Sequence, residues 1–165
     1  MPQKTRILNQ EQITLKLKRM AFQIWERNND EKELILIGVE QSGRILANAL
    51  AALLHEISPL KVTVCSIVIN KKDPLATPAI IETNVTGKSV VLVDDVANSG
   101  RTLLYAIKPL LDYAVKKILI TVLVDRKHKF FPVTPDIVGY SMATTLQDHI
   151  EVECKGTTIV GAYLL

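Results

Sequence analysis

Two adjacent carboxylates, Asp94 and Asp95, follow an apolar run and precede a turn at 96–100. The turn and the expected helix start present backbone N–H groups without partners inside the helix, and the helix dipole adds positive potential, so this segment favours phosphate binding. The carboxylates suit vicinal hydroxyls and would stabilise positive charge on a sugar carbon. Together they fit a ribose 5-phosphate. The candidate phosphate-binding residues are Val96, Ala97, Asn98, Ser99, Gly100, Arg101 and Thr102.

The surrounding sequence predicts the elements that position this turn. Apolar or β-branched runs indicate strands at 34–39, 62–69, 89–93, 118–124, 137–140 and 158–164. Helices are expected at 10–27, after the capping residue Asn9, at 44–55, and at 102–113, where Pro109 should kink or end the helix. Strands that alternate with helices predict an α/β fold with an open, mainly parallel sheet and helices on both faces. Ligands bind such sheets at the carboxyl ends of the strands.

Composition bounds the class of protein. A chain of 165 residues with 48% hydrophobic content is expected to form a single domain, 1–165. The net charge of +3 suits an anionic ligand but does not require nucleic acid. The sequence offers no signal core and no membrane span, and Cys65 and Cys154 have no pairing pattern, so a cytoplasmic protein is expected.

The segment Val90–Thr102 resembles the signature of the type I phosphoribosyltransferases, which bind 5-phosphoribosyl-1-diphosphate (PRPP). The stretches 122–128, 131–133 and 136–139 are similar to the bifunctional pyrimidine operon attenuator and uracil phosphoribosyltransferase family, and the likeness covers nearly the whole chain. It implies the type I fold with a small hood. It also implies the transfer of phosphoribose from PRPP, bound with Mg²⁺, to a nucleobase, which gives a nucleoside 5′-monophosphate and diphosphate.

The resemblance assigns further roles by position. It implies Asp94 and Asp95 as catalytic carboxylates, and it places Lys71 and Lys72 on a flexible loop that closes over PRPP, although these lysines would equally suit a solvated loop. The segment after Val124 would form the hood over the base. The candidate base contacts are Asp125, Arg126 and His128.

The loop after Val39 departs from the family pattern. The candidate pyrophosphate loop consists of Glu40, Gln41, Ser42, Gly43 and Arg44, where the attenuator family has a basic residue and a Thr-Arg-Gly run. Ser42 and Gly43 are expected to turn the chain. Either Arg44 reaches the diphosphate, or it is a solvated residue of the first helical turn and diphosphate affinity is reduced.

Asn98 bears on the choice of base. The 6-oxopurine phosphoribosyltransferases carry an acid at the matching position, and an amide cannot act as a general base. Hypoxanthine and guanine are therefore disfavoured, and the resemblance to the uracil phosphoribosyltransferase family implies uracil as the base.

Two other readings compete with the enzyme. A nucleotide-sensing RNA-binding regulator would need a basic face, which Lys16, Lys18, Arg19 and Arg27 would supply unless they form the solvated side of the first helix. A phospho-acceptor receiver domain fails because its acidic pair belongs after the first strand.

The resemblance implies a homodimer or higher homo-oligomer. The isolated His55 and His149 are expected to be surface residues.

Overall fold

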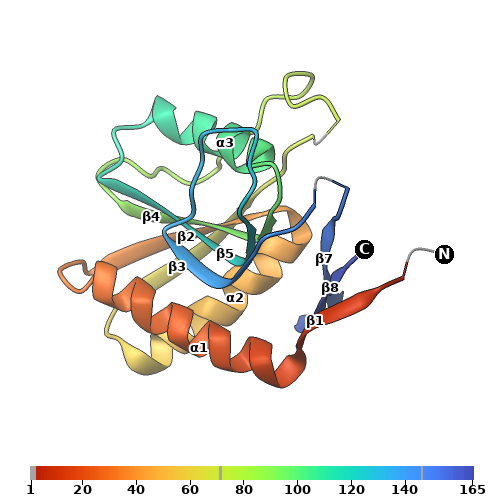
Figure 1. Ribbon diagram of the computed structural model, residues 1–165. Helices are drawn as coiled ribbons and strands as arrows, with labels where there is room; N and C mark the ends of the chain where they lie inside the picture. The colour runs from red at the N-terminus through yellow and green to blue at the C-terminus, as the bar shows by residue number, and fades with distance from the viewer. Residues whose placement is uncertain (1–2, 71, 146) are drawn as a thin grey trace.

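A five-stranded parallel sheet forms the centre of the computed structural model, which describes residues 3–70, 72–145 and 147–165 (Figure 1). The strands lie in the order β3-β2-β4-β5-β6, so β4 is central and borders β2 and β5. This arrangement confirms the predicted open, parallel α/β sheet. The strands are β2 (Glu33–Val39), β3 (Lys61–Ile67), β4 (Ser89–Ala97), β5 (Lys117–Arg126) and β6 (Ile137–Met142).

Helices cover both faces of this sheet, as the alternating pattern predicted (Figure 1). Helices α1 (Gln10–Arg27) and α2 (Glu40–Ile57) pack together on one face. Helix α3 (Arg101–Ile107) and the 3₁₀ segment η1 (Lys108–Asp112) lie on the other. The α-helix stops before Pro109 because proline cannot donate the backbone hydrogen bond that would continue it.

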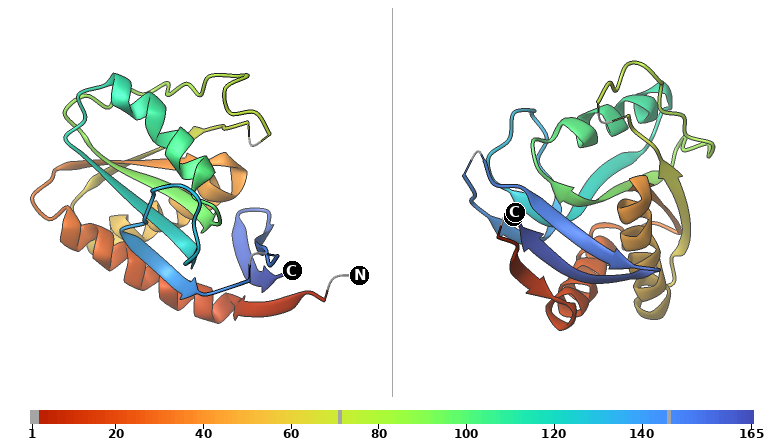
Figure 2. Two further views of the ribbon diagram at one scale, coloured as in Figure 1. Left: turned by 45° about the horizontal axis from the view of Figure 1, so that its top comes forward. Right: turned by 90° about the vertical axis from the view of Figure 1, so that its right-hand side faces the viewer.

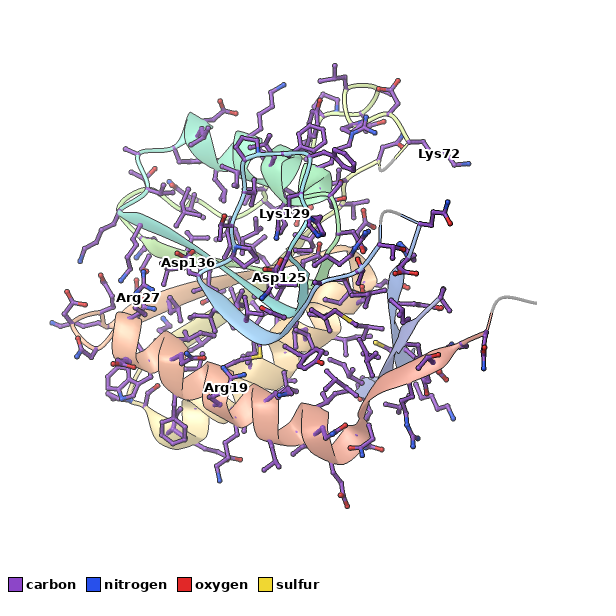
Figure 3. All side chains as sticks on the ribbon, in the orientation of Figure 1. Arg19, Arg27, Lys72, Asp125, Lys129 and Asp136 are labelled. Carbon is purple, nitrogen blue, oxygen red and sulfur yellow. The ribbon has the colours of Figure 1, made fainter. Side chains whose placement is uncertain are left out.

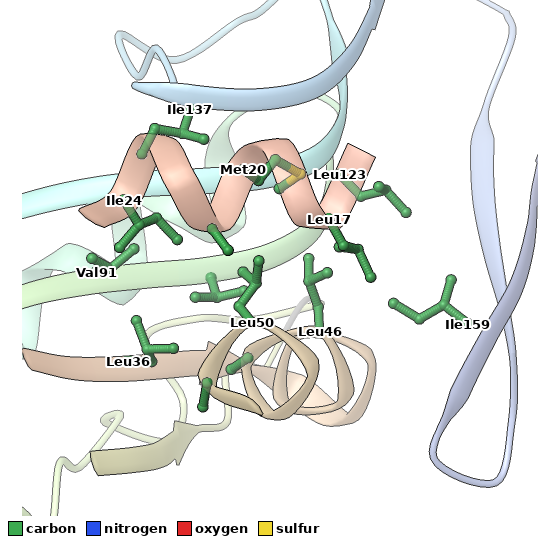
Figure 4. Packing of buried hydrophobic residues seen from close by; sticks show 14 of the residues in the cluster. Leu17, Met20, Ile24, Leu36, Leu46, Leu50, Val91, Leu123, Ile137 and Ile159 are labelled. Carbon is green, nitrogen blue, oxygen red and sulfur yellow. The ribbon is translucent and has the colours of Figure 1, made fainter. Parts of the chain in front are cut away.

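The apolar stripe of α1 builds one of the two cores. Leu17, Met20 and Ile24 are buried at helical spacing and point toward α2 and the sheet (Figure 4). Leu46 and Leu50 of α2 meet them from the opposite side. The second core lies under α3, so each face of the sheet is covered by its own apolar core. This explains why the strands are continuous apolar runs in the sequence.

Helix α1 begins with a capping box at Asn9. The Asn9 side chain accepts a hydrogen bond from the Gln12 N–H at 2.8 Å, and the Gln12 side chain accepts one from the Asn9 N–H at 2.9 Å. Replacing Asn9 with alanine removes one of these bonds, so the free energy of unfolding should fall by about 1 kcal/mol. Denaturant titration measures this loss. Asn29→Ala, at an exposed asparagine beyond the other end of α1, is the control and should change stability little.

A second, antiparallel sheet joins the two ends of the chain (Figure 2). Strand β1 (Thr5–Asn9) pairs with β8 (Thr158–Leu164), which pairs with β7 (Ile150–Lys155). Ile159 points from this small sheet toward the core formed by α1 and α2 (Figure 4). Sequence analysis predicted β8 but missed β1 and β7, because both strands are short and mix charged with apolar residues.

Candidate ligand site at the carboxyl edge of the sheet

Asp94 and Asp95 lie inside the carboxyl end of β4 rather than after it. The strand was expected to end at Val93, but it continues to Ala97, where Ala97 still pairs with Asp125 of β5. Asp94 is only 4% exposed. Its carboxylate accepts a hydrogen bond from the Asp95 N–H, and the Asp95 carboxylate accepts one from the Val96 N–H, both at 2.8 Å. These local bonds fix the orientation of both carboxylates.

The predicted phosphate turn follows at once. Gly100 has a left-handed backbone with φ 86° and stands at the start of α3, which explains the need for glycine there. The Ser99 hydroxyl accepts a hydrogen bond from the Arg101 N–H at 3.2 Å. Asn98 Oδ1 is buried and has no hydrogen-bond partner among the described residues. A buried acceptor without a partner is costly, so this atom is well placed to receive a donor from a ligand.

A cavity of about 340 Å³ opens beside this turn. One wall is the carboxyl end of β4, the turn and the start of α3, and the other is the start of β7. The lining residues are Asp94, Asp95, Val96, Ala97, Asn98, Ser99, Gly100, Thr102, Leu103, His149, Ile150, Glu151 and Val152. The structure therefore brings together the predicted carboxylates and all but one of the predicted phosphate-binding residues. The exception, Arg101, lies near the Tyr105 ring, 5.9 Å from its centre.

The wall formed by β7 was not predicted. His149, expected to be an isolated surface residue, is exposed and also lines the cavity. Its backbone exchanges two hydrogen bonds with Leu165, at 2.8 and 3.3 Å, which hold the start of β7 in place. The short apolar alternation of Ile150 and Val152 was the available signal in the sequence, and the charged residues between them obscured it.

The three candidate base contacts do not line the cavity. The Asp125 carboxylate forms an ion pair with Lys129 at 2.5 Å, and Lys129 also donates to the Arg126 carbonyl at 2.8 Å (Figure 3). The Arg126 guanidinium donates to the Thr144 hydroxyl at 2.7 Å, and His128 is exposed. Arg126 is thus bonded to the segment after β6, and Asp125 to the loop after β5.

That loop braces the phosphate turn. The N–H groups of Phe130 and Phe131 both donate to the Ser99 carbonyl, at 3.0 and 3.1 Å. A Cβ added to Gly100 would approach the Phe131 carbonyl oxygen to 3.3 Å and the Lys129 side chain to 3.5 Å. The turn is thus packed between the loop after β5 and the cavity, which limits its movement.

Glu40–Arg44 is the first turn of α2, so the prediction that this helix begins only at Arg44 was wrong. Glu40 itself reverses the chain with a left-handed backbone at φ 61°, the one positive φ among the described residues other than glycine. Gly38 and Gly43 let the helix approach the sheet: a Cβ at Gly43 would lie 2.7 Å from the Val93 carbonyl oxygen. Glu40, Gln41 and Ser42 line a second hollow, of about 380 Å³, with Ile45, Val152 and Cys154.

Two of the basic residues predicted to act on the diphosphate, Arg44 and Lys72, lie apart from both hollows. Arg44 is exposed and absent from their walls; it is close enough to Cys65 of β3 to oppose the rise that burial causes in the pKa of that thiol. Lys72 is exposed on the excursion after β3 and points away from Asp125 (Figure 3). Lys71 lies outside the described residues.

Cys154 reports the proximity of the small sheet to Asp95. Burial raises the pKa of the Cys154 thiol, and the carboxylates of Asp95 and Glu153 raise it further. Asp95→Asn should therefore lower the pKa of Cys154 toward its ordinary value, so that iodoacetamide reacts faster at about pH 8. Alkylation rates against pH, in a Cys65→Ser background, measure the change. An unaltered rate profile would contradict the proximity of these two groups.

Comparisons with known proteins agree with the fold. The sequence profile described as the phosphoribosyl transferase domain matches residues 3–155. The Bifunctional protein PyrR of Microcystis aeruginosa is 36% identical over 160 residues, covering 92% of this chain and 90% of that protein. The Bifunctional protein PyrR of Haemophilus ducreyi is 31% identical over 159 residues, covering 90% and 89%.

Two solved structures share the fold at lower identity. A hypoxanthine-guanine phosphoribosyltransferase from Bacillus anthracis has a TM-score of 0.74 and 22% identity, with 96% of each chain covered. The hypoxanthine phosphoribosyltransferase of Trypanosoma cruzi has a TM-score of 0.78 and 16% identity, with 95% covered. The fold is thus that of the type I phosphoribosyltransferases. The chain belongs to the phosphoribosyl transferase domain family, as the signature at 90–102 indicated.

Proposed function

We propose that the protein is a phosphoribosyltransferase that converts uracil and PRPP, bound with Mg²⁺, to uridine 5′-monophosphate and diphosphate. The observation that carries the proposal is the cavity where Asp94 and Asp95 stand beside the phosphate turn. Membership of the family supports the class of reaction, and the relatives named Bifunctional protein PyrR support a pyrimidine. The proposal treats residues 1–165 as one domain.

In the proposed reaction, the turn at 98–102 holds the 5-phosphate through its backbone N–H groups and the hydroxyls of Ser99 and Thr102. Asp94 and Asp95 accept hydrogen bonds from the ribose hydroxyls and stabilise the positive charge that develops at C1. The bond from C1 to the diphosphate oxygen breaks, the bond from C1 to the uracil N1 forms, and the N1 proton passes to solvent. The preset carboxylates contribute because they need not reorganise during this step.

The donor set fits Mg²⁺, which prefers carboxylate and amide oxygens. The carboxylates of Asp94 and Asp95 supply such oxygens at the cavity. Within the described ranges, no cluster of three or more histidine, cysteine or acidic side chains converges on one point. The ion would therefore be held jointly with PRPP. When bound, it supplies charge neutralisation to the diphosphate leaving group.

The remaining assignments belong to the same proposal. Lys71 and Lys72 close over PRPP from the excursion after β3 and bring positive charge to the diphosphate. Asn98 disfavours 6-oxopurines because an amide cannot take a proton from the base. The His149 side of the cavity receives the base.

A cytoplasmic location keeps Cys65 and Cys154 reduced, and a homodimer is the expected assembly. No helix in the described part of the chain is long and apolar enough to cross a membrane.

A weakly active, nucleotide-sensing regulator that binds RNA is the second candidate. The observation that favours it is Glu40, a carboxylate where a diphosphate-binding loop was expected. Two of the four basic side chains expected to form its RNA surface, Arg19 and Arg27, have partners within the chain. Arg19 donates to the carbonyls of Val138 and Gly139 at 3.1 and 2.6 Å, and Arg27 pairs with Asp136 at 4.0 Å (Figure 3).

Product formation from PRPP and Mg²⁺ with uracil, hypoxanthine, guanine, xanthine and adenine, each supplied separately, tests the proposal. Turnover with uracil and slower turnover with the purines is the expected result. Turnover with no base, in protein that still binds uridine 5′-monophosphate, would reject the enzyme and favour the regulator. In that case, salt-dependent binding to RNA is the next measurement.

A further inference from the structure

The hollow lined by Glu40, Gln41 and Ser42 lies beside the main cavity, and it is negatively charged although it lies at a helix start. Val152 lines both hollows, so a ligand whose ribose lies at Asp94 and Asp95 can extend past Val152 toward the start of α2. A helix start normally favours anions through its unpaired N–H groups and dipole. Yet of the six residues that line this hollow, Glu40 is the only one charged at neutral pH, and none is basic.

The Glu40 carboxylate is held in place. Its backbone is left-handed, at φ 61°, which costs energy for a residue with a side chain. Its Oε1 accepts a hydrogen bond from the Ile69 N–H at 2.9 Å, just beyond the end of β3. Moving the carboxylate away from an incoming anion would break this bond and leave the N–H of a buried residue unpaired.

Asp95 and Glu153 add negative charge near this hollow, and Lys4 pairs with Glu153 at 3.6 Å. Cys154, on its wall, has a pKa raised by burial and then by Asp95 and Glu153. Arg44, which follows Glu40 in the same helical turn, is not part of the wall of this hollow. A diphosphate placed here would meet the Glu40 carboxylate, with no basic residue among the six that line the hollow.

We infer that Glu40 makes the site select nucleoside 5′-monophosphates over PRPP. Both ligands present a ribose 5-phosphate to the phosphate turn, but only PRPP carries a diphosphate on C1. The inference rests on the proposed function, because it takes the ribose 5-phosphate site at Asp94 and Asp95 as given. It deepens that function because it names Glu40 as the residue that lowers the affinity of this site for PRPP relative to its nucleotide product.

Equilibrium binding of PRPP, ribose 5-phosphate and uridine 5′-monophosphate, with and without Mg²⁺, tests the inference. Glu40→Gln removes the charge but keeps an oxygen that can accept from the Ile69 N–H. Glu40→Gly removes charge and side chain and suits the left-handed backbone, so one variant remains informative if the other fails to fold. Glu56→Gln is the matched control, an exposed glutamate at the far end of α2.

Both Glu40 variants should bind PRPP about tenfold more tightly than the wild type, because removing one charge relieves its repulsion of the diphosphate. Their affinity for ribose 5-phosphate and the nucleotide should stay within about twofold. Glu56→Gln should bind all three as the wild type does. Unchanged or weaker PRPP binding in the Glu40 variants, with ribose 5-phosphate binding intact, would overturn the inference alone. Failure of the wild type to bind any of the three would overturn the proposed function as well.

Discussion

Turnover should fall about 10³-fold or more when Asp94 and Asp95 are both replaced with asparagine, since removing a single preorganised group commonly costs about 10² to 10³ in rate. Asparagine keeps a side-chain oxygen at both positions, so the bonds to the N–H groups of Asp95 and Val96 can persist. What is lost is the negative charge that opposes the positive charge at C1. Steady-state product formation from PRPP and uracil measures the effect.

The phosphate turn provides the control for this variant. Its N–H groups and the Ser99 and Thr102 hydroxyls are unchanged, so ribose 5-phosphate should still bind. A variant that binds ribose 5-phosphate normally and retains more than about a tenth of the wild-type rate would contradict the electrostatic role of the pair.

Gly43→Val should lower the free energy of unfolding by about 3 kcal/mol, because even a single Cβ at this position would stand 2.7 Å from the Val93 carbonyl oxygen. That oxygen belongs to the backbone of the central strand and cannot rotate away. Helix α2 must shift, and the same Cβ lies 3.5 Å from Asp94 Cα, so the shift reaches the carboxylates. Thermal or denaturant unfolding gives the loss, and ligand binding should weaken with it.

Ala52→Val is the matched control for Gly43→Val. Ala52 is exposed on the same helix, so the substitution adds the same β-branched side chain with solvent to receive it. Its cost should be no more than about 0.5 kcal/mol, from helix propensity alone. If the two variants lose similar stability, the close approach of α2 to β4 is not what Gly43 provides.

Long periodic segments allowed most of the fold to be predicted from sequence. The stripe of Ile13, Leu17, Met20 and Ile24 gave α1 its full extent, and Asn9 its cap. The continuous apolar runs gave the strands of the parallel sheet, because a strand covered on both faces needs no polar alternation. Pro109 marked the end of the α-helical part of α3.

The start of α2 and the small sheet were harder to predict, for different physical reasons. The residues Ser42 and Gly43 are typical of a turn, yet the chain reverses at Glu40, whose strained backbone is stabilised by a bond to Ile69 far away in sequence. Strand β1 is stabilised by its pairing with β8 at the other end of the chain. Neither contact leaves a local pattern.

Part of the candidate site could be predicted from the sequence, and part depends on contacts between distant segments. The carboxylates and phosphate turn are contiguous, so 94–102 could be read directly from the sequence. The opposite wall comes from His149 and Val152, which only the tertiary fold brings to the turn. Asp125 and Arg126 were named because they resemble family positions, but the sequence could not show that Lys129 and Thr144 would occupy them.

The central claim is that the turn after Asp94 and Asp95 binds the 5-phosphate of a ribose. Backbone amide chemical shifts, recorded while uridine 5′-monophosphate or uridine is added, test it most directly. The account predicts saturable shifts at 98–102 and 149–152 with the nucleotide, and loss of the shifts at 98–102 with the nucleoside. Nucleotide-induced shifts that avoid 98–102, or that are the same with uridine, would contradict it.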